Sequence, residues 1–144
     1  MTETRTSLPA KLENLPLFMA AATEFARHAG FTEERIGSLE LALEEVLVNV
    51  FKYAYPGGQG EATVVCRSEN AGTLFIRIED AGVPFNMLEA KAPDINAGID
   101  DRPIGGLGIF LVRKLMDDVR YARQDGRNIL TLIMLKNSSR TPAA

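Results

Sequence analysis

The stretch from Glu40 to Gly58, which reads ELALEEVLVNVFKYAYPGG, constrains the fold of this chain more than any other segment. At about 100° per residue, its apolar side chains fall on nearly every side of a helix, a pattern typical of a helix packed between other elements. The helix is predicted to stop near Tyr55 and Pro56, where two glycines follow. Its main core stripe, which begins one turn upstream of the stretch, comprises Ile36, Leu39, Leu43, Val46, Leu47 and Val50.

Two polar residues interrupt this apolar helix. Glu45 and Asn49 are four residues apart, so they share one face, in a different sector from the core stripe. A buried carboxylate or carboxamide without a partner would cost about 1–3 kcal/mol. The pair therefore either caps or bridges a neighbouring helix, or faces a cavity.

Flanking segments predict the remaining elements. Apolar spacing indicates a helix at 16–29, closed by Gly30, and Thr32 is expected to cap the helix that contains Glu45. Alternation predicts two antiparallel hairpins, with strands at 61–67 and 73–79 and at 119–123 and 128–136. A third helix is expected at 104–117, between the hairpins. Helices grouped on one face of antiparallel hairpins make an α+β two-layer sandwich.

The predicted domain organisation is simple. A chain of 144 residues with 46% hydrophobic residues suits one domain, and no internal repeat or dividing linker is visible. The domain is expected over 12–136, after a polar N-terminal segment at 1–11, and the tail at 137–144 is expected to be flexible. An edge strand leading into the first helix is expected within LPAKLENLP, at 8–16.

Charge and composition argue against several kinds of partner. The chain has 16 basic and 19 acidic residues, and neither sign is clustered, so no footprint for nucleic acid or an anionic membrane is present. No signal peptide and no run of about 20 apolar residues is visible, so a cytoplasmic protein is expected. The single Cys66 fits a buried small hydrophobe in a reducing compartment, and His28, the only histidine, fits a solvated helix end.

Glu45 and Asn49 also have the chemistry of a site. An asparagine oxygen is a hard ligand suited to Mg²⁺, which keeps several waters and is completed by substrate phosphates. Glu45, one helical turn away, could act as a general base on a water or a hydroxyl. On these two residues alone, the structural alternative of a satisfied polar pair stays open.

Asp80, Gly82 and Pro84 follow a buried strand, in the turn DAGVPFN. An aspartate at a strand end can accept a hydrogen bond from an exocyclic amine, and Gly82 would let a flat ring approach the backbone. The alternative is an Asx turn without a ligand. The weakly periodic segment that follows, 87–103, is a candidate lid.

A glycine-rich run, Gly105, Gly106, Leu107 and Gly108, opens the third predicted helix. Free N–H groups and the positive end of the helix dipole favour a phosphate there. The run is not the G-x-G-x-x-G of a dinucleotide fold, since no βαβ crossover surrounds it, and it lacks the Lys-Ser/Thr of a P-loop. By itself it is weak evidence.

In order and spacing, Glu-x-x-x-Asn, Asp-x-Gly-x-Pro and Gly-Gly-x-Gly together resemble the ATP-binding domain of the GHKL superfamily, which includes gyrase-type ATPases, sensor histidine kinases and MutL. Within it, NVFKYAYPGG, IEDAGVPFN and RPIGGLGIFLVRKLMDDVRY resemble the small stand-alone anti-sigma-factor serine/threonine kinases typified by RsbW and SpoIIAB, over 16–136. The resemblance implies a sandwich of the Bergerat ATP-binding type, with a mixed, mostly antiparallel sheet and helices on one face.

The resemblance also implies ATP and Mg²⁺ as cofactors. Asn49 matches the Mg²⁺ ligand, and Glu45 matches the proposed general base. Asp80 matches the residue that reads the adenine amine, and 87–103 matches the ATP lid. Tyr53 stands where many relatives have histidine, a change expected to alter only the rim. The other implied nucleotide-binding residues are Gly82, Pro84, Gly105, Gly106, Leu107, Gly108 and Thr131, the last matching a strand threonine that closes the adenine pocket.

The leading hypothesis is an ATP- and Mg²⁺-dependent kinase that phosphorylates a serine or threonine of a small anti-anti-sigma protein of the STAS type. In such a partner-switching system the kinase also holds a sigma factor inactive, and the resemblance implies a homodimer. The alternative is a catalytically silent ATP-binding module that sequesters its partner. A sensor histidine kinase fits worst, because it needs a phospho-acceptor histidine on a separate dimerisation helix and this chain has only His28.

Overall fold

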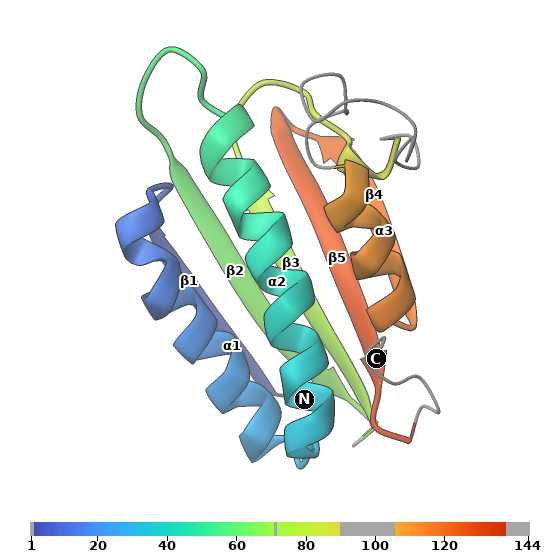
Figure 1. The fold of residues 1–144 in the computed structure, drawn as a ribbon. Helices are drawn as coiled ribbons and strands as arrows, with labels where there is room; N and C mark the ends of the chain where they lie inside the picture. Colours follow the sequence, from blue (N-terminus) through green and yellow to red (C-terminus); the bar gives the residue numbers. More distant parts are fainter. Residues whose placement is uncertain (1, 71, 90–105, 138–144) are drawn as a thin grey trace.

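The computed structural model describes residues 2–70, 72–89 and 106–137. Within them, a layer of α-helices covers one face of an antiparallel sheet, as Figure 1 shows. The elements are β1 (Thr2–Pro9), η1 (Leu12–Asn14), α1 (Leu15–His28), α2 (Glu33–Tyr53), β2 (Glu61–Glu69), β3 (Thr73–Asp80), η2 (Met87–Glu89), α3 (Gly106–Leu115), β4 (Asp118–Gln124) and β5 (Arg127–Leu135). The predicted α+β two-layer sandwich is confirmed.

Local signals explain where the first two helices begin and end. The Thr32 side chain accepts a hydrogen bond from Arg35 N at 3.2 Å, so it caps α2 as predicted. Gly30 has a φ of 89°, which favours glycine over any residue with a Cβ, and it closes α1. The ends of both helices lie within two residues of the predicted ones.

The sheet has the strand order β1-β2-β3-β5-β4. All four pairings in the described residues are antiparallel, so the expected mixed sheet shows no parallel pair there. The β4–β5 turn has Asp125 at φ 54° and Gly126 at φ 76°, the two positive φ angles of a type I′ hairpin turn. Both predicted hairpins are therefore present.

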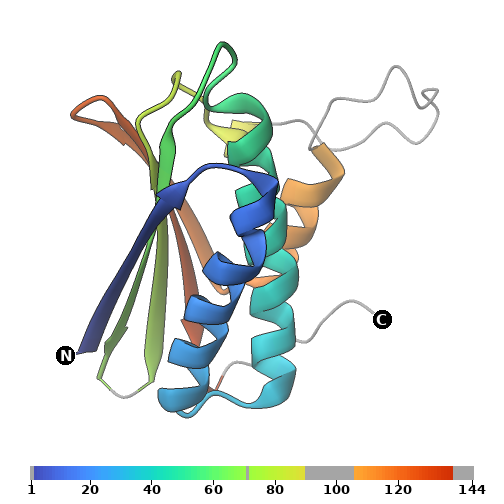
Figure 2. The same cartoon turned by 90° about the vertical axis from the view of Figure 1, so that its left-hand side faces the viewer.

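The edge strand was predicted too late in the chain. β1 pairs with β2 from Thr2 opposite Ser68 to Pro9 opposite Glu61, whereas Leu12–Asn14 forms a short 3-10 helix. Since β1 lies at the sheet edge and only α1 faces it, as Figure 2 shows, it needs no strong apolar alternation. Most of its side chains are exposed, which explains why its sequence looks like a polar tail.

The core lies between the helices and the sheet, with α2 in the middle of the helical layer (Figure 1). All six residues of the predicted core stripe of α2 are buried. At the lower end of the sandwich, Arg35 Nη2 donates to Asp117 Oδ2 at 2.9 Å, and Leu135 N donates to the same oxygen at 2.7 Å. This buried ion pair ties the start of α2 to Asp117, between α3 and β4, and the same carboxylate also holds the end of β5. No helix of the described residues has the length and apolar character needed to cross a membrane.

Candidate functional site

The Glu45–Asn49 pair lies on the part of α2 that faces α3. Asn49 is 5% exposed, and its Nδ2 donates to Glu45 O at 2.7 Å and to Glu45 Oε1 at 2.9 Å. Because both partners are acceptors, the orientation of the amide is determined. Asn49 Oδ1 accepts no hydrogen bond from any described residue. It does not belong to the fully buried side-chain atoms of the described residues that lack a hydrogen-bond partner, which are nitrogens of three arginines. The Asn49 amide nitrogen is therefore satisfied by Glu45, and the Asn49 amide oxygen, a hard ligand, stays available.

Gly108 brings the glycine-rich patch to the same place. A methyl group at this position would lie 2.5 Å from Glu45 Cγ and would overlap the carboxylate, so the first turn of α3 contacts the Glu45 side chain directly. Gly106 is the first residue of α3 and Leu107 follows it, whereas Gly105 lies outside the described residues. The structure thus joins two of the three patches seen in the sequence.

Asp80 is the last residue of β3 and is 3% exposed. Its Oδ1 accepts from Gly82 N at 2.9 Å and from Asn128 Nδ2 at 2.9 Å. The bond to Gly82 is an Asx turn, the alternative considered for this motif. No described residue donates to Oδ2, so the turn uses one carboxylate oxygen and leaves the other for a ligand.

The Asp80 loop is held against the C-terminal end of α2. Val83 N donates to Ala54 O at 2.8 Å, and a methyl group on Gly82 would lie 2.6 Å from the carbonyl carbon of Ala54. Tyr55 Oη accepts from Ala81 N at 2.9 Å, and burial raises the pKa of this phenol. All three patches therefore contact α2 or the residues that directly follow its C-terminal end, Ala54 and Tyr55.

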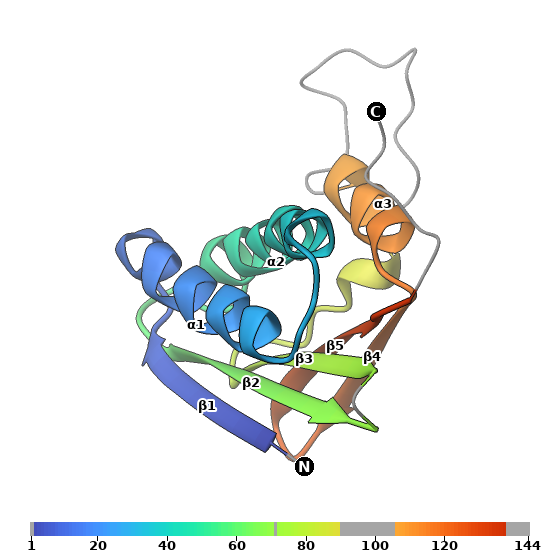
Figure 3. The ribbon, with the colours of Figure 1, turned by 90° about the horizontal axis from the view of Figure 1, so that it is seen from below.

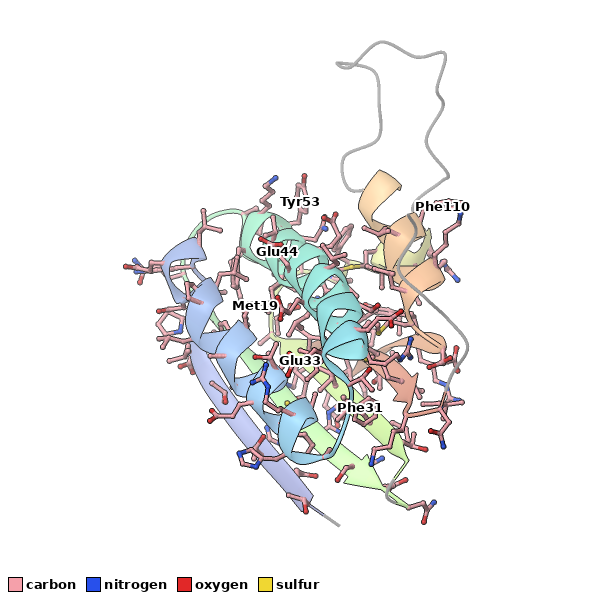
Figure 4. All side chains as sticks on the ribbon, turned by 60° about the horizontal axis from the view of Figure 1, so that its bottom comes forward. Met19, Phe31, Glu33, Glu44, Tyr53 and Phe110 are labelled. Atoms are coloured by element: carbon pink, nitrogen blue, oxygen red, sulfur yellow. The ribbon has the colours of Figure 1, made fainter. Side chains whose placement is uncertain are left out.

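A narrow slot beside Asp80 has a free volume of about 10 Å³. Asp80 and Asn128 form its polar end, and its apolar walls are Val50, Ala54, Ile78, Phe85, Met87, Tyr121 and Leu130. Tyr53 lies at the C-terminal end of α2 (Figure 4), where its ring centroid is 5.6 Å from that of Phe85. Tyr53 is therefore outside the slot and beside its wall. Pro84 is exposed, in an open groove beside Gly57 and Gly58.

Thr131 does not close this slot, and that prediction is wrong. It pairs with Arg77 on β3 and Arg120 on β4, and its side chain lies in a groove on the sheet face opposite the helices. Side chains alternate along a strand, so three positions from Asn128 the side chain points to the other face. β5 has apolar residues on both faces, which hides this parity in the sequence.

Asn128 is the site residue that the sequence argument missed. It lies directly opposite Asp80 in the β3–β5 register. Besides its bond to Asp80, its Nδ2 donates to Val83 O at 2.8 Å, and its Oδ1 accepts from Phe85 N at 3.1 Å and from Tyr121 Oη at 2.5 Å. The register of the two hairpins would have been the signal, since it places a polar residue opposite Asp80.

The predicted lid lies almost entirely outside the described residues. Of 87–103, only Met87–Glu89 is described, and it forms η2. Arg113 Nη2, on α3, donates to Leu88 O at 2.8 Å. The beginning of this segment is therefore attached to α3, the helix whose Gly108 packs against Glu45.

The protein oxygens near Glu45 suit a metal ion that is held mainly by the phosphates of a bound molecule and by waters. In the part of the chain that the structure describes, no group of three or more His, Cys, Asp or Glu side chains could hold a metal ion. Asn49 Oδ1, a hard oxygen, is the available donor near Glu45. This is compatible with Mg²⁺, which is usually held by one or two protein oxygens together with phosphates and waters.

Comparison with known proteins agrees with this geometry. The model of the histidine kinase-like ATPase domain family matches residues 8–134. The serine-protein kinase RsbW of Listeria monocytogenes is 34% identical over 128 residues, which cover 85% of this chain and 81% of that protein. Its counterpart in Bacillus cereus strain ATCC 10987 is 32% identical over 127 residues, with 85% and 79% covered.

A solved structure shares the fold. The RsbU and RsbW domains of a Mycobacterium tuberculosis protein match this chain with a TM-score of 0.67 at 16% identity. The match covers 99% of this chain and 35% of the other, so this chain spans about a third of that protein's length. At this identity the likeness concerns the fold alone.

Proposed function

The chain belongs to the histidine kinase-like ATPase family, among relatives that are RsbW serine-protein kinases, and we propose that it binds ATP with Mg²⁺ and phosphorylates a partner protein. The proposed substrate is a serine or threonine of a small anti-anti-sigma protein of the STAS type. We further propose that the protein acts in the cytoplasm and sequesters a sigma factor when the unphosphorylated partner is scarce.

The observation that carries this proposal is the convergence of three polar patches on α2. Glu45 and Asn49 lie on the helix itself, Gly108 packs on Glu45, and the Asp80 loop bonds to Ala54. Two oxygens in this region, Asn49 Oδ1 and Asp80 Oδ2, have no donor among the described residues. One suits a metal–phosphate group and the other an exocyclic amine, which are the two ends of ATP.

Adenine would enter the slot beside Asp80. Its free volume of about 10 Å³ is far below the roughly 300–1,000 Å³ typical of ligand pockets. Met87 and Phe85, two of its apolar walls, would therefore have to move aside when the nucleotide binds. In the bound state Asp80 Oδ2 would accept from the adenine amine, while Oδ1 stays bonded to Gly82 and Asn128.

Phosphoryl transfer would take place near Glu45. The acceptor hydroxyl oxygen bonds to the γ-phosphorus, the bond to the β–γ bridging oxygen breaks, and ADP leaves. Glu45 takes the hydroxyl proton, while Asn49 stays bonded to Glu45 Oε1 and keeps the carboxylate oriented. Bound Mg²⁺ would supply charge stabilisation to the phosphates, with Asn49 Oδ1 as its protein ligand. The backbone N–H groups at the start of α3 would bind the phosphates.

One observation favours a second candidate, the catalytically silent ATP-binding module. The Glu45 carboxylate already accepts from Asn49 and packs against Gly108, so it has a structural role without any reaction. In that case Glu45 would support nucleotide binding, and sequestration of the partner would be the whole function.

The two candidates are separated by incubating the protein with labelled ATP, Mg²⁺ and small STAS-type proteins from the same genome. Glu45→Gln is the test variant, and Glu44→Gln is its matched control, because Glu44 is the exposed neighbour on the same helix (Figure 4). Kinase function predicts that label transfer falls about a hundredfold or more in Glu45→Gln, the usual contribution of a general base, and stays unchanged in Glu44→Gln. Binding of ATP without transfer by the wild type would favour the silent module.

Nucleotide recognition is tested separately by Asp80→Asn. Gly82 N and Asn128 Nδ2 both donate to Oδ1, so the new amide must present its oxygen to them and its NH₂ group in place of Oδ2. A donor would then face the adenine amine, and ATP affinity is expected to fall about ten- to a hundredfold, equivalent to about 1.4–2.8 kcal/mol. Unchanged affinity by calorimetry would show that adenine does not bind there.

A further inference from the structure

The sheet face opposite the helices has a groove lined by three arginines. The helices α1, α2 and α3 lie on one face of the sheet, and no described element covers the other face (Figure 3). The groove in this open face has a free volume of about 200 Å³, below the roughly 300–1,000 Å³ of pockets for drug-sized ligands, so it suits a smaller molecule. Its lining residues come from all five strands and are Glu3, Val65, Arg67, Phe75, Arg77, Arg120, Thr131 and Ile133.

Strand register brings the three arginines together from distant parts of the chain. Thr131 pairs with Arg77 on one side and with Arg120 on the other, so the two arginines flank it. Val65 pairs with Arg77 from β2, and Arg67 lies two positions further along that strand. Residues two positions apart on a strand share a face, so all three arginines are on the open side of the sheet.

The floor of the groove is apolar. Val65 is 2% exposed and Ile133 is 7% exposed, although no described element lies over them. Long arginine side chains can cover apolar surface with their stems while the charged ends stay in water. The guanidinium of Arg67 lies over the ring of Phe75, 4.7 Å from its centroid, at the side of the groove. The groove therefore combines an apolar floor with a cationic rim.

Each of the three arginines keeps hydrogen-bond donors free. Each is paired through Nε with a carboxylate two positions away on its own strand, and the pairs are Arg67–Glu69, Arg77–Glu79 and Arg120–Asp118. Their Nη groups donate to no described residue, and Arg67 Nε is buried without a hydrogen bond because Glu69 Oε1 is 3.4 Å away. The hydroxyl of Thr131 also bonds to no described residue. These free donors suit an anionic ligand.

The surroundings of the groove indicate which anion fits. Glu3 in the groove and Asp118 beside Arg120 would repel an extended polyanion such as a nucleic acid, which argues for a compact ligand. A guanidinium matches a carboxylate with two parallel hydrogen bonds. The apolar floor favours a hydrocarbon segment, which pyrophosphate lacks. Arg77 and Arg120 are two strand spacings apart, about 10 Å between their backbones, so they approach the floor from opposite sides and suit a ligand with a charge at each end.

We propose that this groove binds a small dicarboxylate. Arg120 holds one carboxylate, Arg67 and Arg77 hold the other, and the hydrocarbon chain lies on the apolar floor. Thr131, which does not belong to the slot beside Asp80, lies between the arginines and donates to the ligand. The groove and that slot are on opposite faces of the sheet, so the proposal does not depend on ATP binding or on phosphoryl transfer.

Titration of the full chain with succinate, followed by NMR at constant low ionic strength, tests the proposal. Succinate should shift the backbone amide signals of Arg77, Thr131 and Arg120. Arg120→Gln should weaken binding about tenfold or more, because it removes one charged pair of hydrogen bonds to the ligand. Its partner Asp118 is half exposed and can bond to water, so the fold should not change. Arg5→Gln, the same charge change on the same sheet face outside the groove, is the control and should bind succinate as the wild type does.

Glu3→Gln gives a result that misfolding cannot imitate. Glu3 is the only carboxylate among the residues that line the groove, so its removal should tighten succinate binding several-fold. Butyrate, with one carboxylate, and pyrophosphate, without a hydrocarbon chain, should both bind more weakly than succinate.

Three results would overturn the proposal. The first is a titration in which succinate shifts none of the groove signals. The second is an equal loss of affinity in Arg120→Gln and Arg5→Gln, because it would mean that the face attracts anions only through its overall charge. The third is tighter binding of pyrophosphate than of succinate, because it would make the ligand a phosphate anion.

Discussion

Asn128 is expected to be the residue whose loss most disturbs the candidate site without touching a ligand. Alanine at this position removes four hydrogen bonds, to Asp80 Oδ1, Val83 O, Phe85 N and Tyr121 Oη. Each such bond contributes about 0.5–1.5 kcal/mol net, so their sum is about 2–6 kcal/mol. Val83 is exposed and Tyr121 is partly exposed, so their freed groups can bond to water. The expected loss in unfolding free energy is therefore in the lower half of this range, about 2–4 kcal/mol.

The same substitution should weaken nucleotide binding. Asp80 Oδ1 would keep the Gly82 bond and lose the one from Asn128, so its carboxylate and the loop to Phe85 would be less well positioned. We expect ATP affinity to fall about tenfold or more, equivalent to about 1.4 kcal/mol. Urea unfolding measures the first effect, and calorimetry with ATP and ADP measures the second.

Thr131→Ala is the matched control, because Thr131 lies on the same strand and points to the other face. Its unfolding free energy is expected to change by less than about 0.5 kcal/mol, as for other substitutions away from special features, and its ATP affinity should be unchanged. The reasoning would be refuted if Asn128→Ala matched the wild type in both measurements. Equal losses of ATP affinity in the two variants would also refute it.

Three further predictions follow from the packing. Asp117→Ala leaves the buried guanidinium of its ion pair without this partner and should lower the unfolding free energy by about 3 kcal/mol in urea, whereas alanine at its exposed neighbour Asp118 should have little effect. Burial raises the pKa of the Cys66 thiol from 9.0 to about 11. The folded state therefore favours the neutral thiol, and its contribution to stability is fully present below pH 9. Between pH 9 and 11 the unfolding free energy of the wild type should fall by up to about 3 kcal/mol relative to that of Cys66→Ala. Gly108→Ala should displace the Glu45 carboxylate, lowering label transfer more than stability; transfer at the wild-type rate would show that α3 is not held against Glu45.

Most of the fold was predictable because it depends on local signals. The apolar period of α2, the Thr32 cap, Gly30 and the Asp125–Gly126 turn act over a few residues, and each is present as expected. β1 was misplaced because its position depends on pairing with β2, which is distant in the chain. A strand held by backbone hydrogen bonds at a sheet edge leaves little pattern in its side chains.

The candidate site was likewise predictable in part from the sequence. The order and spacing of its three motifs are properties of the sequence, and so is the presence of Glu45, Asn49 and Asp80 at the ends or faces of predicted elements. The sequence does not show which side chain shares a pocket with Asp80. Because β5 is apolar on both faces, only its register with β3 decides between Asn128 and Thr131.

The sequence by itself determined which residues can do the chemistry, and the tertiary structure decided which of their atoms are available. Asn49 Nδ2 bonds to Glu45, and Asp80 Oδ1 bonds to Gly82 and Asn128, so Asn49 Oδ1 and Asp80 Oδ2 are the oxygens that no described residue occupies. The physical reason is that hydrogen bonds among polar side chains compete with ligand binding, and the outcome depends on neighbours that only folding brings together.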